Sequence, residues 1–405
     1  MLGNAVLARL LARAERARLS GSTRTIRESF KSHESAYWKQ SLDERDHMHA
    51  RMQAAKVTGA IELEWAKQGG DDRPLEAIVL RDLDKLSQYL GVPTVGTSVA
   101  KATGLLAPWK HGPRVMELLS NWGSLKQVRS LGPDSAADFV DALQVLDAVS
   151  GAKEDQVLRQ LSVQLFRNSK RLEALCKHID ILTAEAFNSP ARHWSEVFGS
   201  IGISKEPQPF LLAGIGELRL IGGAECPIVR PFLGVANSAI AGYQGEPEWL
   251  LTIENLTTFH QAARALGTDL KGVVIYTAGM PSPSWGKAYV RILSRLPSTC
   301  CVYHWGDHDE GGFRIAARIA QFAAQLGRSI KPWSMESNAW EDSGQMASKE
   351  QLGSMVRSAI KAGWQDLADE LRPILLEQEG QPLLLPPTSL PKAFNVCDEN
   401  CARRR

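Results

Sequence analysis

Three carboxylates, Glu254, Asp307 and Asp309, follow short apolar segments of the chain. Residues 247–255 form an apolar run that ends in Glu254, and residues 300–306 lead directly into Asp307. Because residues i and i+2 of an extended segment point to the same side, we expect Asp307 and Asp309 to converge. Unpaired carboxylates in one place repel one another unless a cation neutralises them. Since oxygen ligands favour Mg²⁺ or Mn²⁺, the pattern predicts a divalent cation site suited to phosphoryl chemistry.

Alternating strand and helix patterns position these acids. The order is β-α-β-α-β-α, which predicts an α/β domain with a Rossmann-like parallel sheet and a site at the carboxyl ends of its strands. Gly311 and Gly312 leave room for a phosphate at a helix start, where free N–H groups favour anions. Besides the two runs that end at the acids, the predicted segments are a helix over 256–267, a strand over 271–279, and helices over 284–296 and 313–325.

The same spacing carries a family resemblance. A strand-terminal Glu, followed two β-α steps later by Asp-x-Asp, resembles the Toprim domain, the metal-binding module of topoisomerases, primases and several nucleases. The detailed residue sequence of several segments resembles that of the JetD family, the nuclease subunits of Wadjet plasmid-defence systems, and that of the related MksG family. The resemblance extends over roughly residues 205–390. The segments that carry it are 252–259, 276–282, 304–313 and 376–379.

The resemblance implies a metal-dependent DNA endonuclease that cleaves phosphodiesters by metal-activated water. Glu254, Asp307 and Asp309 would be its catalytic residues and would hold Mg²⁺ or Mn²⁺. Glu377 and Glu379 lie in the family's late motif and are candidate additional metal ligands. The implied partners are double-stranded plasmid DNA and an SMC-like motor with kleisin and accessory subunits. A homodimer is expected, because two sites can cut both strands.

Two other functions stay open on the sequence. One is a tyrosine transesterase related to the topoisomerase VI A subunit, and the other is a non-catalytic DNA-binding adaptor. The tyrosines of the amino-terminal half are Tyr37 and Tyr89, and neither stands in the arginine-led Tyr-Tyr context of those topoisomerases. No Gly-x-x-x-x-Gly-Lys-Ser/Thr run is present in the sequence, so we expect any ATPase to be a separate subunit.

Three basic residues are candidates for contacts with DNA phosphates: Lys170, Arg171 and Arg314. Capping and solvation account for Lys170 and Arg171 equally simply, and an ordinary ion pair on a helix surface accounts for Arg314. For His304 and His308 we expect structural or solvent-facing positions.

The composition bounds these hypotheses. The chain has 405 residues, of which 44% are hydrophobic and 23% charged, so two or three soluble domains are expected. A net charge of +2 excludes a uniformly basic surface and leaves local patches for nucleic acid. No run reaches the length of a membrane span, so a cytoplasmic protein is predicted. One basic patch comprises Arg9, Arg13, Arg16, Arg18, Arg24, Arg27 and Lys31.

The six cysteines show no four-ligand zinc spacing, and we interpret them as reduced thiols. Cys397 and Cys401 stand in a tail that ends in three arginines, where they either form a disulfide or belong to a frayed terminus.

Four regions are predicted along the chain. Helix, hairpin and helix patterns in the second region are typical of a winged-helix unit, which either contacts DNA or docks a protein. Glycines and prolines over 91–113 predict a loop or linker. The regions are a basic helical arm over 1–42, a winged-helix-like domain over 43–110, a helical middle region over 111–205, and a Toprim domain with a carboxyl-terminal extension over 206–405.

Overall fold

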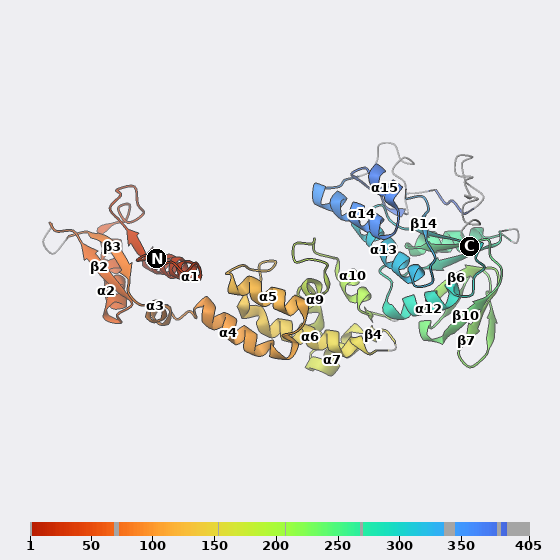
Figure 1. Cartoon of the computed structure of the whole chain (residues 1–405), viewed down its shortest axis with the longest axis horizontal. Helices are drawn as coiled ribbons and strands as arrows, with labels where there is room; N and C mark the ends of the chain where they lie inside the picture. The colour runs from red at the N-terminus through yellow and green to blue at the C-terminus, as the bar shows by residue number, and fades with distance from the viewer. Residues whose placement is uncertain are drawn as a thin grey trace. The chain divides into compact units, whose positions relative to one another are not determined.

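The protein is described from a computed structural model, which places residues 2–68, 73–152, 154–206, 208–267, 270–335, 345–378 and 382–386. It has two compact units, residues 1–141 and 142–405, and the division falls within helix α6 (Ala136–Ser150). The fold is mixed α/β (Figure 1).

The first unit contains a small antiparallel sheet in the order β1-β3-β2, covered by helices. Helix α2 begins with a capping box, in which Ser41 and Glu44 satisfy each other's backbone N–H groups. Helix α3 begins at Asp82, whose carboxylate accepts two backbone N–H groups, and ends at Gly91 in the left-handed conformation. The elements are α1 (Leu2–Leu19), β1 (Arg27–Ser29), α2 (Leu42–Val57), β2 (Ile61–Trp65), β3 (Leu75–Leu80) and α3 (Leu83–Leu90).

One core joins these elements. Leu7 and Leu10 of α1 are buried together with Met52 of α2 and Ile78 of β3. The apolar face of α1 is therefore part of the core, whereas its arginines lie on the other face. Arg13 pairs with Glu28 of β1 at 2.5 Å.

Two expectations for the first unit are wrong. Residues 91–113 are not a loop, because α4 (Val95–Leu105) and η2 (Ala107–Trp109) occupy most of them. Thr94 caps α4 by accepting the N–H of Thr97, and this cap together with the burial of Leu106 outweighs the roughly 1 kcal/mol that each helical glycine costs. The basic helical arm expected over 1–42 is helical only as far as Leu19, since β1 and turns follow.

Short helices follow. The first of them are α5 (Pro113–Gly123), η3 (Pro133–Ser135) and α6. In the second unit they are α7 (Leu158–Phe166), α8 (Arg171–Ala174), α9 (Cys176–Thr183) and α10 (Trp194–Ser200). A two-stranded parallel pair is formed there by β4 (Gln156–Val157) and β5 (Ile203–Ser204). These helices lie in the region over 111–205 that was predicted to be helical.

The second unit is built on a six-stranded sheet in the order β14-β13-β11-β12-β6-β9. The four strands from β14 to β12 are parallel, whereas β6 and β9 are antiparallel, so the expectation of a purely parallel sheet is wrong at this edge. Every residue of β11 is buried, as for a strand covered on both faces. The strands are β6 (Phe210–Gly214), β9 (Leu233–Val235), β11 (Trp249–Ile253), β12 (Gly272–Tyr276), β13 (Cys301–Trp305) and β14 (Lys331–Pro332).

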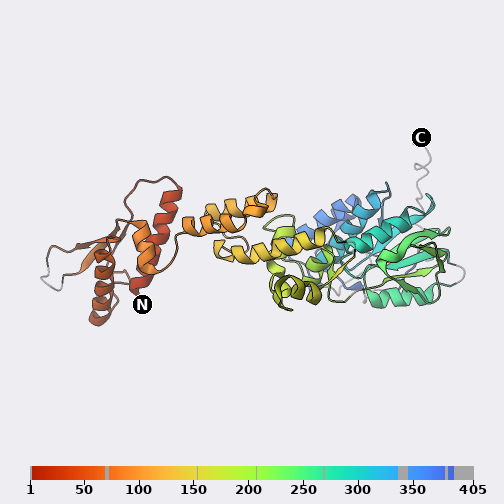
Figure 2. The same ribbon diagram turned by 90° about the horizontal axis from the view of Figure 1, so that it is seen from below.

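Helices lie against this sheet. Helices α13 and α14 run side by side in both views (Figures 1 and 2), and α15 packs on α14. The helices are α11 (Leu256–Ala265), α12 (Pro283–Leu293), α13 (Glu310–Ala324), α14 (Lys349–Lys361) and α15 (Gln365–Glu370).

Two small sheets complete the unit. The first contains β10 (Ile240–Gln244), β7 (Glu217–Leu220) and β8 (Glu225–Pro227), and η4 (Asn237–Ala239) precedes β10. The second contains β15 (Gln345–Met346) and β16 (Ile374–Leu375). None of the helices in the described residues is both long and apolar enough to cross a membrane.

Candidate functional site

The carboxyl ends of β11 and β13 bring two of the predicted acids together. Ile253 is in register with Trp305, and the backbone N–H of Glu254 donates to the carbonyl of Trp305 at 3.0 Å. The backbone N–H of Asp307 in turn donates to Oε2 of Glu254 at 3.1 Å. The parallel register therefore places the Glu254 carboxylate against the loop that begins with Asp307.

Two glycines make this close approach possible. A Cβ at Gly306 would lie 2.7 Å from Oε2 of Glu254 and 2.9 Å from Nε2 of His304. A Cβ at Gly312 would lie 2.0 Å from the carbonyl oxygen of Asp307. At Gly312 the clash would be with the backbone, so the loop requires glycine there, whereas at Gly306 the side chains of Glu254 and His304 would have to shift.

Asp309 has a different role from the other two acids in this structure. It is the N-cap of α13, and its Oδ1 accepts the backbone N–H of Gly312 at 2.7 Å. Its backbone is extended, as predicted. One of its carboxylate oxygens is thus committed to starting the helix, and the acid remains close enough to influence Glu254 electrostatically.

Glu254 carries the strongest electrostatic signal of the site. Burial is the main cause that raises the pKa of its carboxyl to about 8. The negative charges of Asp307, Asp309 and Glu196 act in the same direction, whereas the hydrogen bond from the backbone of Asp307 lowers the pKa. The shift therefore reflects removal of the carboxyl from water first, and the neighbouring negative charges second. A bound cation would relieve it.

The residues present fit a hard divalent cation in their chemistry. Glu254, Asp307 and Asp309 supply only carboxylate oxygens, the ligand type that Mg²⁺ and Mn²⁺ prefer. Within the described residues, however, the side chains form no group of three or more His, Cys, Asp or Glu arranged around one point for a metal. The cap made by Asp309 is one reason, because its Oδ1 is turned toward Gly312.

Gln378 is a site residue that the sequence analysis missed. Its side chain is fully buried, and its backbone N–H donates to Oδ1 of Asp307 at 2.7 Å. Its side-chain oxygen accepts the N–H of Asn255 at 2.8 Å, and its side-chain nitrogen donates to the carbonyl of Trp305 at 3.3 Å. The side-chain amide of Gln378 therefore ties the ends of β11 and β13 together, and its backbone N–H holds the Asp307 carboxylate. The signal available was its place between Glu377 and Glu379 in the family-like segment 376–379.

Glu377 and Glu379, which flank Gln378 in the sequence, were predicted as additional metal ligands. Glu377 is exposed, and no contact brings it to the acids in the part of the chain that the structure places. Glu379 lies outside the described residues, as do Cys397 and Cys401.

His308 fastens the segment around Gln378 to the acidic loop. Its backbone N–H donates to the carbonyl of Leu376 at 2.8 Å, and its Nδ1 lies 2.8 Å from the carbonyl oxygen of Ile374. Burial lowers the pKa of the His308 imidazole. It therefore acts as a neutral structural group.

His304 is buried beneath the site. Its Nδ1 lies 2.9 Å from Oγ1 of Thr252, and its Nε2 has no hydrogen-bond partner among the described residues. Burial lowers its pKa to about 3. Both histidines thus have the structural positions that the sequence analysis expected.

The predicted phosphate contacts are dispersed. Arg314 forms a two-point ion pair with Glu196 of α10, at 2.6 and 2.8 Å, and its guanidinium also lies 3.6 Å from Glu310. This is the ion-pair alternative left open by the sequence. Lys170 is exposed at the start of α8, and Arg171 is half-buried in the same helix, which packs on α7 and α9.

The two tyrosines considered for a covalent mechanism are engaged within the first unit. The hydroxyl of Tyr37 is buried, lies 2.9 Å from Nε2 of His49 and accepts the N–H of Leu75 at 2.9 Å. The hydroxyl of Tyr89 donates to the carbonyl of Arg51 at 3.1 Å. Burial raises the pKa of Tyr37, which makes it a poorer nucleophile.

Comparison with known families identifies the segment that contains the acids. Residues 226–380 match the family model described as Wadjet protein JetD, C-terminal. This region of the chain is therefore similar to the carboxyl-terminal region of JetD. The match includes Glu254, Asp307, Asp309 and Gln378, and it confirms the resemblance seen in the sequence. A search of curated proteins finds none that matches the chain.

Proposed function

We propose that this chain is the metal-dependent DNA endonuclease subunit of a Wadjet anti-plasmid complex. The observation that carries the proposal is the half-buried Glu254, whose pKa is raised by desolvation and by Asp307 at the adjoining strand ends, within the family-matched region. A carboxylate with unbalanced negative neighbours is what a metal-dependent phosphodiesterase site needs before its cation binds.

The residues have distinct tasks in this proposal. Glu254, Asp307 and Asp309 would hold one or two Mg²⁺ or Mn²⁺ ions, which supply charge neutralisation to the phosphate and lower the pKa of water. Glu254 is also the candidate general base, since a bound cation would return it to the carboxylate form and it lies beside the Asp307 backbone at the site. Gln378 fixes Asp307 through the backbone N–H and keeps the two strand ends together.

The finer architecture belongs to the same proposal. The sheet from β14 to β12 with its acidic edge serves as a Toprim domain, and the α/β core of the first unit serves as a winged-helix module. The chain works as a homodimer with an SMC-like motor, its kleisin and accessory subunits, and the motor selects the plasmid DNA. A hydrolytic mechanism is favoured over tyrosine transesterification because the hydroxyls of Tyr37 and Tyr89 are both engaged.

The test is cleavage of supercoiled plasmid and matched linear DNA in Mg²⁺ or Mn²⁺, by the chain alone and with its Wadjet partners. The variants are Glu254→Gln and Asp307→Asn, which keep the side-chain shape, with the exposed Glu377→Gln as the matched control. We expect both site variants to lose cleavage by at least about 10²-fold, as removal of a charge-stabilising group commonly does, and the control to keep it. Products are compared with and without protease digestion.

Three results would contradict the proposal. The first is wild-type activity in Glu254→Gln, and the second is DNA ends that stay on protein until protease is added, which indicates a tyrosine linkage. The third is DNA binding without cleavage even in the complete complex, which indicates an adaptor.

A further inference from the structure

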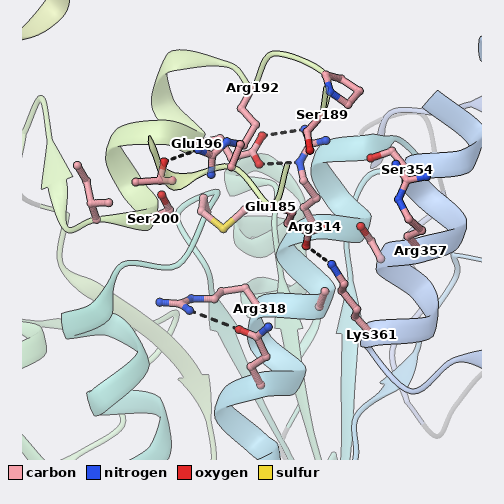
Figure 3. Close-up of a pocket in the computed structure, with 18 residues that line it drawn as sticks. Glu185, Ser189, Arg192, Glu196, Ser200, Arg314, Arg318, Ser354, Arg357 and Lys361 are labelled. Carbon is pink, nitrogen blue, oxygen red and sulfur yellow. Dashed lines mark hydrogen bonds and ion pairs between the residues drawn. The ribbon is translucent and has the colours of Figure 1, made fainter. Parts of the chain in front are cut away.

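A pocket of about 360 Å³ opens in the second unit next to the acidic site. It is bounded by α13, by α14 and by the segment 183–201 (Figure 3). Glu196 connects the two places, because it lines the pocket and its charge also acts on Glu254. A ligand in the pocket would therefore lie close to the acids.

Helix α13 contributes a polar stripe to the pocket. Arg314, Arg318 and Gln321 follow one another at spacings of four and three residues, which places them along one helix face. Helix α13 starts at Glu310, directly after Asp309, and the stripe begins five residues beyond Asp309. It thus leads away from the acidic loop along the helix.

Helix α14 contributes a second stripe, in which hydroxyls alternate with cations. Ser354 and Ser358 are buried and small, and Arg357 and Lys361 stand on the same side of the helix (Figure 3). Hydroxyl, guanidinium and ammonium groups are all hydrogen-bond donors to phosphate oxygens.

Internal ion pairs account for part of the positive charge. Arg192 pairs with Asp180 at 2.6 Å, and Arg314 pairs with Glu196 at 2.6 Å. Lys361 pairs with Glu185. These three cations are therefore largely neutralised within the protein.

Arg318 and Arg357 are the exception. Neither has a carboxylate partner in the part of the chain that the structure describes. The Nε of Arg318 is buried without a hydrogen-bond partner there, although its guanidinium lies against Gln321 and over the ring of Phe322. Arg357 is exposed. The pocket thus holds two guanidinium groups that an external anion can satisfy.

We propose that this pocket binds the sugar–phosphate backbone of the DNA strand that enters the acidic site, with Arg318 and Arg357 contacting separate phosphates. The inference rests on the proposed nuclease function and adds its strand-positioning residues. Arg318 and Arg357 lie on opposite sides of the pocket (Figure 3), which suits an extended polyanion better than one small ion. Backbone contacts of this kind set the register of the strand without reading its sequence.

The experiment measures affinity of the full chain for a fluorescent 40-base-pair duplex by anisotropy, in EDTA so that no cleavage occurs. The variants are Arg318→Gln, Arg357→Gln and the double variant. Arg264→Gln is the control, because Arg264 is exposed on α11 and does not line the pocket. We expect each pocket variant to weaken binding about 5- to 10-fold, and the slope of log affinity against log salt to fall by about one per arginine removed. Arg357 is exposed, so its variant folds even where Arg318→Gln does not, and thermal melting of each variant checks this.

Each other result overturns the inference. The inference fails if the pocket variants bind DNA with an affinity within twofold of that of Arg264→Gln. It also fails if the wild-type chain has no affinity for the duplex. A third outcome combines two results: inorganic triphosphate protects the chain from thermal unfolding, and the variants keep their affinity for DNA. The pocket would then be assigned to a free polyphosphate. The inference and the proposed nuclease function fail separately: arginine-dependent binding without cleavage removes only the nuclease, and cleavage with arginine-independent binding removes only the pocket.

Discussion

The backbone N–H of Gln378 donates a 2.7 Å hydrogen bond to Oδ1 of Asp307, across 71 residues of sequence. The Gln378 side chain also contacts the residue that follows Glu254 and the last residue of β13. The acidic edge of the sheet is therefore held by a buried amide as well as by the strands. The amide is neutral, so it adds no charge to a site that is already too negative.

Replacing Gln378 by Ala should loosen this edge. The N–H of Asn255 would lose this acceptor, and a buried polar group left unsatisfied costs about 1–3 kcal/mol, whereas the carbonyl of Trp305 would keep the N–H of Glu254. We expect a lower urea midpoint together with reduced cleavage. The exposed Glu377→Ala serves as control and should change neither. Unchanged stability of Gln378→Ala would show that the amide does not tie the strands together.

Gly306→Ala should damage the site through shape alone. Its Cβ would approach Oε2 of Glu254 to 2.7 Å, well inside van der Waals contact, so the carboxylate must move. We expect cleavage to fall by roughly 10²-fold or more, because small displacements of reacting groups have effects of that size. Gly104→Ala in α4 is the matched control, since a Cβ there meets nothing within 4 Å. Equal cleavage by the two variants would contradict the inference that the Glu254 carboxylate must keep its present position.

The pH dependence of stability should report the raised pKa of Glu254. Its pKa is about 8 in the folded chain against 4.5 for an ordinary carboxyl, so the folded state holds an extra proton between these values. Unfolding then releases a proton in this window, and the Glu254 contribution to stability falls as pH rises from about 4.5 to 8. In metal-free buffer, Glu254→Gln should therefore gain stability relative to wild type between pH 5 and pH 9.

Urea unfolding at pH 5, 7 and 9 in EDTA measures this difference. Glu377→Gln, at an exposed position outside the cluster, controls for the removal of a surface carboxylate. A stability difference between Glu254→Gln and wild type that does not change with pH would mean that Glu254 titrates normally in the fold.

Local patterns were sufficient for much of the second unit. The helices over 256–267 and 284–296 and the strands over 271–279 and 300–306 are confirmed as α11, α12, β12 and β13, with shifts of a few residues at their ends. Each carries its own signal, namely an apolar run or a helical period with a cap. The meeting of Glu254 and Asp307 followed from the parallel order of β11 and β13.

Relationships between distant segments were not predictable in the same way. The antiparallel direction of β6 depends on its pairing with β12 and leaves no mark on its own residues. Gln378 acts through contacts with chain segments 71 to 123 residues away, and the partner of Arg314 lies 118 residues before it. A hydrophobic or charge pattern shows only what one element requires, whereas these contacts arise when elements pack together.

Addition of Mg²⁺ or Mn²⁺ should stabilise the second unit, because a cation bound only by the folded state adds its binding free energy to that of unfolding. At 100 times the dissociation constant the gain is about 2.7 kcal/mol, which is measurable as a rise in melting temperature. The rise should disappear in Asp307→Asn and shrink in Asp309→Asn. Asp309→Asn keeps an acceptor for the N–H of Gly312, so α13 should still begin at the same residue. A rise of equal size in wild type and in both variants would place the cation elsewhere on the chain.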